Sequence, residues 1–333
     1  MRRNLITDVP GVRVGHAEDP RLASGVTAIV FEAPAVGSID VRGGGPGTRE
    51  TALLDPAQTV EGIDAIALSG GSAFGLDAAS GVQAWLAEQG RGFAVRTARV
   101  PIVPGAILFD LLNGGDKAWG RFPPYRELGY AAAERAGADF ALGSAGAGLG
   151  ATTVNLKGGL GSVSAACEGF TVGALAAVNA AGSAVVGDGP WFWAAPFERE
   201  REFGGRGFPS PLPPGALEPL TKGLARISTT LVVVATDAAL TKAQAKRLAV
   251  MAQTGLARAV YPVHTQLDGD VVFACSTARI PLGDAMRLTA LGAVAALCVA
   301  RAIAVGVHRA SALPFPGAIP AWGDRFAHGE RRP

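Results

Sequence analysis

Charged residues are scarce in this chain of 333 residues, where Asp, Glu, Lys and Arg make up 17% and the formal net charge is +2. No basic run is longer than Arg331-Arg332, so the chain lacks the positive surface that nucleic acids and anionic membranes attract. Hydrophobic residues make up 49% of the chain, which excludes intrinsic disorder and provides a large core. We therefore expect a globular protein that binds neither nucleic acid nor membranes.

Cysteine and histidine are rare as well. The three cysteines lie far apart in apolar stretches, at Cys167, Cys275 and Cys298. This spacing argues against a disulfide framework and a zinc knuckle, and it favours a cytoplasmic location. A Ser-His-Asp triad would have to use one of four histidines, which are His16, His264, His308 and His328. Of these, His264 is the one that lies beside an acidic cluster.

No segment has the pattern of a signal peptide or a membrane span. The basic residues at the N-terminus are not followed by an apolar stretch. The longest apolar run, residues 286–307, is interrupted by Arg287 and Arg301 and is rich in Ala and Gly. This pattern favours a helix buried in a globular core.

Motifs for common cofactors are absent or incomplete. The glycines of residues 146–150 lack the third glycine of a dinucleotide fingerprint, and no Gly-x-x-x-x-Gly-Lys-Ser/Thr sequence is present. The stretch Asp268-Gly269-Asp270 lacks the further acidic ligands of a metal-binding loop. The Gly-x-Ser-x-Gly sequence of many hydrolases is also missing. We therefore expect no cofactor and no metal.

Glycine is abundant, with 46 residues, and it is clustered between apolar segments. The clusters lie at residues 43–47, 70–71, 143–150 and 158–161. Because glycine has no side chain, the backbone there can turn tightly or approach another group closely. We interpret the clusters as tight turns within a compact core, some of them lining a pocket.

The first half of the chain shows the periodicity of both strands and helices. Strands are expected at residues 26–31 and 64–69, followed by a helix over residues 74–88 that ends at Gly90. A second helix is expected over residues 130–136.

The middle of the chain changes character. Residues 170–178 and 183–186 are predicted to form a β-hairpin. Residues 187–224 are rich in proline and lack periodicity, which predicts a long loop or linker. The apolar residues 190–193, together with Trp322, would suit a subunit interface.

Regular structure returns after this segment. Residues 229–236 are β-branched and apolar on both faces, which predicts a strand buried between layers. A helix is expected over residues 242–257, with a capping box formed by Thr241 and Gln244. The last predicted elements are a strand and a long helix, at residues 271–276 and 286–307. Strands buried on both faces imply sheets that are covered by helices.

Thr229 begins the buried strand directly after the proline-rich segment. If the preceding peptide bond were cut, Thr229 would carry a hydroxyl and a free α-amine on one residue. The amine, with an ordinary pKa of roughly 7.7–8.0, can accept the hydroxyl proton near neutral pH without a histidine. The alternative is that Thr229 and Thr230 open a strand simply because threonine favours strands.

Several motifs follow one another in a characteristic order along nearly the whole chain. They are residues 8–16, 40–44, 68–76, 146–148 and 157–161, and most specifically residues 229–237 followed by 268–270. In this order they resemble the self-cleaving L-aminopeptidase/D-esterase family. That family includes β-peptidyl aminopeptidases and the endohydrolases of 6-aminohexanoate (nylon) oligomers.

The resemblance implies an α/β fold, a four-layer αββα sandwich like that of N-terminal-nucleophile hydrolases. It implies a single domain, residues 1–333, that is made as one chain and cut between Ser228 and Thr229. The products would be a large subunit, residues 1–228, and a small subunit, residues 229–333, which stay together. The assembly it implies is a homotetramer of processed units.

The resemblance also implies roles for individual residues. Thr229 matches the nucleophile, Asn179 matches a donor of the oxyanion hole, and Lys157 matches a cation close to the nucleophile. Asp268 and Asp270 match the pair that orients the amine and the hydroxyl of the nucleophile. From the residues alone, Asn179 could equally be a turn residue and Lys157 a solvated cation on a loop.

Two positions depart from the family pattern. Ser228 stands where many relatives have Asn or Gly, which bears on the strain of the scissile peptide and introduces a competing hydroxyl. Phe74 stands where some relatives have tyrosine, which removes a phenolic donor to the substrate.

The expected function is therefore the hydrolysis of small amides or of the N-terminal residue of short peptides. One alternative is the endo-cleavage of 6-aminohexanoate oligomers, whose amide is peptide-like but has no α-substituent. The other alternative is an uncleaved, inactive scaffold or binding protein.

Overall fold

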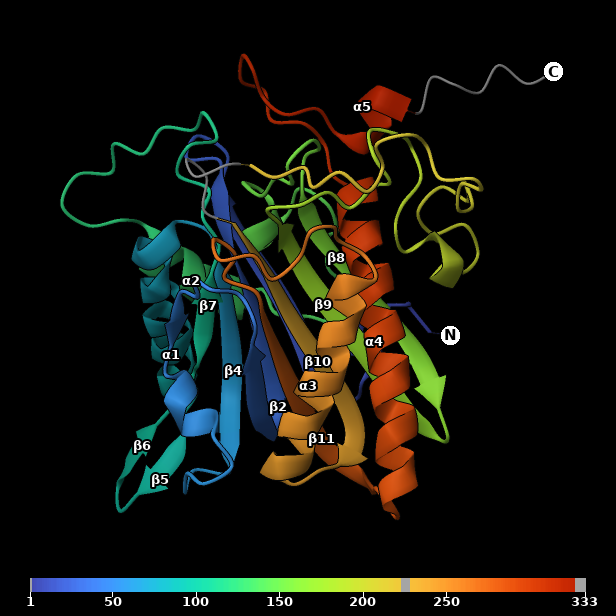
Figure 1. The fold of residues 1–333 in the computed structure, drawn as a ribbon. Helices are drawn as coiled ribbons and strands as arrows, with labels where there is room; N and C mark the ends of the chain where they lie inside the picture. The colour runs from blue at the N-terminus through green and yellow to red at the C-terminus, as the bar shows by residue number, and fades with distance from the viewer. Residues whose placement is uncertain (1, 223–227, 327–333) are drawn as a thin grey trace.

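The structure, a computed structural model, describes residues 2–222 and 228–326. A large β-sheet lies between two pairs of helices (Figure 1). On one side are α1 (Ala78–Glu88) and α2 (Tyr125–Glu134), and on the other are α3 (Lys242–Ala257) and α4 (Ala285–His308). A short helix, α5 (Trp322–Phe326), follows near the end of the described chain.

The sheet contains β1 (Val12–Asp19), β2 (Ser24–Val41), β3 (Thr48–Arg49), β4 (Gly62–Ser69), β7 (Gly105–Ile107), β8 (Gly159–Cys167), β9 (Phe170–Asn179), β10 (Thr229–Ala239) and β11 (Val271–Pro281). Their order is β3-β7-β4-β2-β11-β10-β9-β8, and β1 pairs with β2. A separate hairpin consists of β5 (Phe93–Val95) and β6 (Ala98–Val100). Short 3-10 helices occur at Ile6–Asp8, Thr51–Leu54, Ser72–Asp77, Gly146–Gly148 and Ala195–Phe197.

The long strand β2 joins two halves of this sheet. Its residues 26–30 and, after a register irregularity, 35–36 pair with β4, and its residues 36–41 pair with β11. One apolar cluster lies between the first half and α1 and α2, and another lies between the second half and α3 and α4. A third cluster contains no residue of these four helices and joins strands of both halves, with members such as Ile29, Leu175 and Phe273. The halves therefore pack face to face, and the layers follow the expected αββα order.

Strand β10 lies in the middle of the second half. It pairs antiparallel with β9, so that Thr229 lies opposite Asn179, and parallel with β11, so that Leu231 lies opposite Val271. All of its residues from Thr229 to Ala238 are buried. The prediction of a strand between layers is confirmed.

Most of the other predicted elements are also confirmed. The helix over residues 242–257 is α3, with the predicted capping box at Thr241 and Gln244. The predicted strands are parts of β2, β4, β10 and β11. The helix predicted over residues 74–88 begins as a 3-10 helix before α1, and the helix predicted over residues 130–136 is α2, which starts earlier in the chain.

The predicted hairpin between residues 170–178 and 183–186 is wrong. Residues 170–178 belong to β9, whose hairpin partner is the preceding strand β8. The turn between them is Glu168-Gly169, and both residues have positive φ, 47° and 86°. A two-residue turn of this kind matches the twist of the strands. Residues 183–186 form isolated bridges to other loops.

Helix α4 is long and apolar enough to cross a membrane, as judged by length and composition. In the fold, 78% of its most apolar window is buried. It packs against α3, β8 and β9. Its Arg301 is buried too and pairs with Glu202, with 2.5 Å between Arg301 Nε and Glu202 Oε1. The core helix predicted at residues 286–307 is confirmed.

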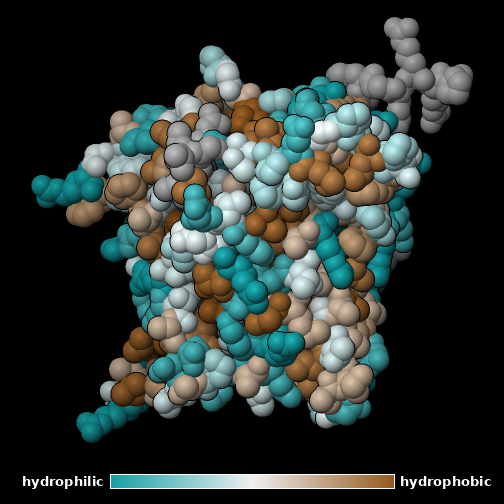
Figure 2. Space-filling view, viewed as in Figure 1, coloured by the Kyte–Doolittle hydropathy of each residue, from teal (hydrophilic) through white to brown (hydrophobic). Residues whose placement is uncertain are grey.

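Residues 187–222 follow the irregular path that was predicted for a loop, and residues 223 and 224 of that prediction lie outside the described residues. Of the residues predicted to suit an interface, Pro190, Trp191 and Trp193 are partly exposed, whereas Phe192 and Trp322 lie inside the protein. Phe192 stacks on Trp322 with ring centroids 5.8 Å apart, and both are buried. Apolar side chains are exposed instead on the β5–β6 hairpin, at the lower left of Figure 2, at Phe93, Val95 and Val100.

Candidate active site

The sheet topology brings distant parts of the chain together at Thr229. Because β9 runs antiparallel to β10, its last residue, Asn179, lies directly opposite Thr229. Because β11 runs parallel to β10, the residues just before β11 lie at the same end, and Asp268 forms a bridge with Ser228. The side chains of Thr229, Asn179, Asp268 and Asp270 are all buried. The topology thus unites four of the five predicted site residues.

The peptide group between Ser228 and Thr229 is held by close contacts. The Thr229 hydroxyl donates to the carbonyl of its own upstream neighbour, with 2.5 Å between Thr229 Oγ1 and Ser228 O. The Gly269 N–H donates to the same oxygen at 2.8 Å, and the Ser228 N–H donates to Leu267 O at 3.1 Å. The Thr229 hydroxyl therefore contacts the Ser228 carbonyl group, whose oxygen also accepts a hydrogen bond from the Gly269 N–H. A backbone N–H at this oxygen is the arrangement found in an oxyanion hole.

Two glycines allow the backbone to come this close. A Cβ atom at Gly269 would lie 2.6 Å from Thr229 Oγ1, and one at Gly43 would lie 2.3 Å from the Asp268 carbonyl oxygen. A side chain at either position would force these neighbours apart. The glycine cluster at residues 43–47 therefore packs against the loop that carries Asp268, in agreement with a role in shaping a site.

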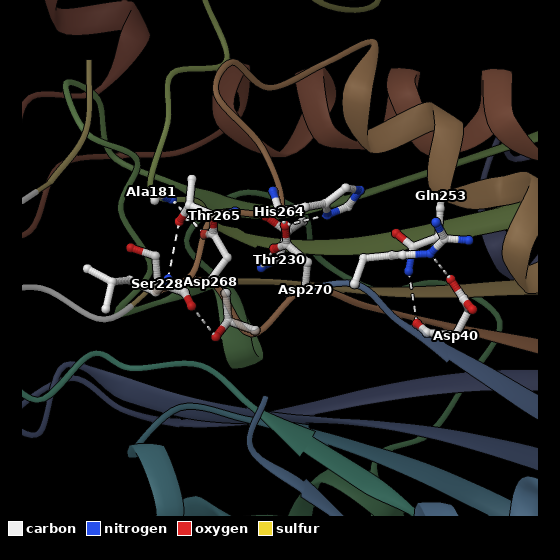
Figure 3. Close-up of polar contacts among 12 residues, drawn as sticks. Asp40, Ala181, Ser228, Thr230, Gln253, His264, Thr265, Asp268 and Asp270 are labelled. Atoms are coloured by element: carbon white, nitrogen blue, oxygen red, sulfur yellow. Dashed lines mark hydrogen bonds and ion pairs between the residues drawn. The ribbon is translucent and has the colours of Figure 1, made fainter. Parts of the chain in front are cut away.

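The two acidic residues are held by different donors (Figure 3). Asp268 accepts from the N–H and the hydroxyl of Thr265 at 2.9 and 2.8 Å and from a backbone N–H just after β9 at 3.1 Å. Asp270 accepts from the Thr230 N–H at 2.7 Å and contacts the N–H and Nδ1 of His264 at 3.1 and 2.9 Å. Burial, and then the charge of Asp270, raise the pKa of Asp268. Asp270 thus orients the backbone next to Thr229, and Asp268 holds a proton more readily than an exposed carboxyl.

The Asn179 side chain is oriented by three hydrogen bonds. Its Oδ1 accepts from the Thr152 N–H at 2.9 Å and from Lys222 Nζ at 3.3 Å. Its Nδ2 donates to Phe109 O at 3.0 Å. Residues directly opposite each other in an antiparallel pair place their side chains side by side. The side chains of Asn179 and Thr229 therefore lie on the same face of the sheet as neighbours.

Lys157 is buried rather than solvated. Its Nζ donates to Gly148 O at 3.0 Å and to Gly158 O at 2.8 Å. Burial lowers the pKa of its ammonium from 10.5 to about 7, although the negative charge of Asp110 acts in the opposite direction. The alternative of a solvated loop cation is therefore wrong, and Lys157 changes its charge near neutral pH.

This pKa predicts a pH-dependent contribution of Lys157 to stability. Between pH 7 and 10.5 the unfolded chain binds the lysine proton and the folded chain does not, so the free energy of unfolding should rise with pH. Below pH 7 the lysine is protonated in both states, so its contribution is constant and at its least favourable. Relative to Lys157→Met, the parent should gain thermal stability only above pH 7. A Tm difference that does not vary with pH would contradict this.

A pocket of about 200 Å³ opens beside these residues. Its lining includes Lys157 as well as Phe109 and Thr152, the two backbone partners of the Asn179 amide. A second loop contributes apolar side chains, at Leu313, Pro316 and Ile319. The pocket thus lies next to the residues that hold the Asn179 amide and offers space for a small molecule.

Two further lining residues were missed in the sequence. Asp110 is buried, and its carboxylate accepts from the Ser24 hydroxyl at 2.6 Å and from the Gly71 N–H at 2.7 Å. Burial raises the pKa of Asp110. Lys222 lines the same pocket. A single Asp after an apolar run and a single Lys in a proline-rich segment have no motif that would have revealed them.

The histidines do not form a serine triad in the described structure. His264 reaches the site as a partner of Asp270, whereas His16 is partly buried and its Nδ1 lies 3.1 Å from Thr27 Oγ1. His308 packs on an aromatic cluster, and His328 lies outside the described residues. Within residues 2–222 and 228–326, no group of three or more His, Cys, Asp and Glu side chains could hold a metal ion.

Phe74, one of the two positions that depart from the family pattern, lies at the protein surface. Phe74 is about half exposed, and its ring packs edge-on against Trp119 with centroids 5.4 Å apart. Trp119 in turn contacts Tyr125. Phe74 thus belongs to an aromatic row and has no polar group to offer a substrate.

Comparison with known proteins gives matches over nearly the whole chain. Residues 4–317 match peptidase family S58. An uncharacterized aminopeptidase of Mycobacterium bovis is 45% identical over an alignment that covers 97% of this chain and 98% of that protein. A 6-aminohexanoate-oligomer endohydrolase of Kocuria sp. is 28% identical, with 88% of this chain and 83% of that protein covered.

The fold is similar to a solved structure as well. The L-aminopeptidase D-Ala-esterase/amidase of Ochrobactrum anthropi, described as a variant of the Ntn hydrolase fold, superposes with a TM-score of 0.69 at 22% identity. The match covers 96% of this chain and 90% of that one. At this identity the likeness shows the fold, and it confirms the predicted fold class. Together with the sequence match from residue 4 to residue 317, these similarities show that the chain belongs to peptidase family S58.

Proposed function

We propose that the chain cuts itself between Ser228 and Thr229 and then uses Thr229 to hydrolyse small amides or the N-terminal residue of short peptides. As a member of peptidase family S58, it is a hydrolase of amide or peptide bonds. The main observation in support of the proposal is the hydrogen bond from the Thr229 hydroxyl to the Ser228 carbonyl oxygen. The same oxygen also accepts a hydrogen bond from the Gly269 N–H. Intact mass spectrometry tests it, because the purified protein should consist of two chains, residues 1–228 and 229–333.

Self-cleavage would start with attack of Thr229 Oγ1 on the Ser228 carbonyl carbon. The hydroxyl proton passes to the Thr229 nitrogen as the peptide C–N bond breaks, which leaves an ester at Oγ1 and a free amine. The Gly269 N–H, 2.8 Å from Ser228 O, stabilises the negative charge that develops on this oxygen. Water then hydrolyses the ester to a Ser228 carboxylate and a Thr229 hydroxyl.

Gly269→Ala should slow self-cleavage strongly. The added methyl group would lie 2.6 Å from Thr229 Oγ1 and 2.9 Å from Gly45 O, so the hydroxyl or the Gly269 N–H must move. Loss of one oxyanion donor alone typically costs on the order of 10²–10³ in rate. The measurement is the fraction of cut chain against time on a denaturing gel.

Gly45→Ala is the matched control for this prediction. It lies in the same region, but the nearest atom to its added Cβ would be 3.7 Å away, which is an ordinary contact. We expect Gly45→Ala to be cut at close to the parental rate. Equal cleavage rates for the two variants would argue against a role of Gly269 at the scissile carbonyl.

After cleavage, the new α-amine of Thr229 would serve as the base for hydrolysis. Its ordinary pKa of roughly 7.7–8.0 allows it to accept the hydroxyl proton as Oγ1 attacks the substrate carbonyl. The Asn179 amide stabilises the resulting oxyanion, and Lys157 is the nearby cation when it is protonated. Asp268 and Asp270 hold the start of β10 in place. The amine product leaves, and water hydrolyses the acyl-Thr229 ester.

A second candidate substrate is the 6-aminohexanoate oligomer. It is supported by the Kocuria endohydrolase, which is 28% identical to this chain, whereas the Mycobacterium bovis aminopeptidase is 45% identical. Aminoacyl anilides and 6-aminohexanoate oligomers should be compared by kcat/KM with the same processed protein. Faster turnover of the oligomer would favour the endohydrolase.

The alternative of an uncleaved binding protein predicts a different result. Such a protein would remain a single band on a denaturing gel. It would also leave the buried hydroxyl, the Gly269 donor and the Lys157 cation without a chemical role. We therefore favour the hydrolase that processes itself.

A further inference from the structure

Lys222 belongs to the irregular, proline-rich segment, yet its side chain reaches the candidate active site. Its Nζ donates to Thr152 O at 2.7 Å, and to Asn179 O and Asn179 Oδ1 at 3.3 Å each. Its backbone N–H donates to Ala181 O at 3.3 Å. Backbone and side chain are therefore both attached to the chain around the end of β9, and the contact with Thr152 further defines where the ammonium lies.

The contacts of the Asn179 amide distinguish its two ends. Two donors, the Lys222 ammonium and the Thr152 N–H, point at one end, and the Phe109 carbonyl oxygen accepts from the other. In the reverse orientation the amide NH2 would face these two donors, and its oxygen would face a carbonyl. The contacts therefore select the orientation with Oδ1 toward Lys222 and Nδ2 toward Phe109.

Lys222 supplies the charged contact among these three. Hydrogen bonds that involve an ionised group are stronger than those between neutral groups. A cation at the amide oxygen also polarises the amide, so its N–H groups become better donors. Nδ2 carries two N–H donors, and the Phe109 carbonyl oxygen accepts from it at 3.0 Å. Asn179, the residue opposite Thr229 in the sheet, therefore carries a second N–H donor besides the one that contacts Phe109.

We propose that Lys222 is a positioning residue that holds the Asn179 amide with its nitrogen available to the oxyanion formed at Thr229. This inference rests on the proposed function, in which Asn179 is the oxyanion donor. An amide that turned over would direct its oxygen at the oxyanion and repel it. Loss of Lys222 should therefore lower kcat and leave KM nearly unchanged, because the amide interaction is strongest in the transition state.

A double-mutant cycle tests the proposal with the parent, Lys222→Met, Asn179→Ala and the double variant. The substrate is a small aminoacyl anilide, and kcat is expressed per cut chain as determined by intact mass. Lys222→Met should lower kcat on the order of 10- to 100-fold, which is the range for one charge-assisted hydrogen bond. Lys222→Arg, which keeps a cationic donor, should recover most of the activity. In the Asn179→Ala background, Lys222→Met should have no further effect, because no amide remains to be oriented.

Lys246→Met is the matched control. Lys246 Nζ also donates to a backbone carbonyl, Ile39 O at 2.7 Å, and to a side-chain oxygen, Asp40 Oδ1 at 3.0 Å. It lies on α3 and does not line the pocket. Its replacement should leave kcat at the parental value. Thermal unfolding verifies that every variant is folded, and Lys222→Gln replaces Lys222→Met if the methionine variant is not.

The outcomes separate this inference from the function on which it rests. If Lys222→Met lowers kcat by the same factor with and without Asn179, the two residues act independently and the proposal is wrong. It is also wrong if Lys222→Met stays uncut while Asn179→Ala is cut, because Lys222 would then act in self-cleavage. If Asn179→Ala itself retains parental kcat, the oxyanion role of Asn179 fails, and the inference about Lys222 fails with it.

Discussion

Thr229→Val should leave the protein as one full-length chain without hydrolase activity. Valine keeps the shape and the strand propensity of threonine but has no hydroxyl. In the structure, that hydroxyl is the group that lies 2.5 Å from the Ser228 carbonyl oxygen. Cleavage and hydrolysis would both use it, so both should be lost. Intact mass and an anilide assay on the same preparation provide the measurement.

The neighbouring residue supplies the control for this experiment. Thr230 is also buried, and its Oγ1 has no hydrogen-bond partner in the described structure. Thr230→Val should therefore be cut and should hydrolyse substrate at nearly the parental rate. If Thr229→Val protein were still cut before residue 229, Thr229 would not be the nucleophile of self-cleavage. Loss of cleavage in both variants would indicate a general effect on packing at the start of β10.

Asn179→Ala should lower kcat on the order of 10²–10³-fold, which corresponds to roughly 3–4 kcal/mol of lost transition-state stabilisation. The side chain lies opposite Thr229 and is oriented as a donor by three hydrogen bonds. Self-cleavage should be affected less, because the Ser228 carbonyl oxygen accepts from Gly269. Steady-state kinetics of the cut chain, with KM reported separately, measure the effect.

Asn155→Ala is the comparison for Asn179→Ala. Asn155 accepts from the hydroxyls of Ser183 at 3.1 Å and Thr153 at 3.4 Å and donates to Gly187 O at 3.5 Å, and none of these partners is a predicted site residue. We expect nearly parental kcat for this variant. A loss of less than about tenfold for Asn179→Ala would remove Asn179 from the oxyanion hole.

Helices and strands could be predicted where a short stretch of sequence contains the pattern that defines them. The β-branched run at residues 229–236 and the capped helix at residues 242–257 need no distant contact to be recognised. The hairpin was wrong because the true turn, Glu168-Gly169, lacks the usual Asn-Gly or Asp-Gly sequence, although both residues adopt positive φ. Asn179 resembles a turn residue in sequence, but it ends a strand in the sheet.

The family motifs and the strand that begins at Thr229 could be recognised in the amino-acid sequence, and the family resemblance pointed to Asn179, Lys157, Asp268 and Asp270 as candidate partners. How these residues lie relative to one another depends on contacts between distant segments of the folded chain. Pairing of β10 with β9 and β11 places Thr229, Asn179, Asp268 and Asp270 at one end of the sheet, and burial lowers the pKa of Lys157 to about 7. The contacts of Gly269 and Lys222 with these residues also arise there. The reason is physical: desolvation, backbone donors and close approach arise between segments far apart in the chain. A short sequence pattern therefore cannot predict these effects.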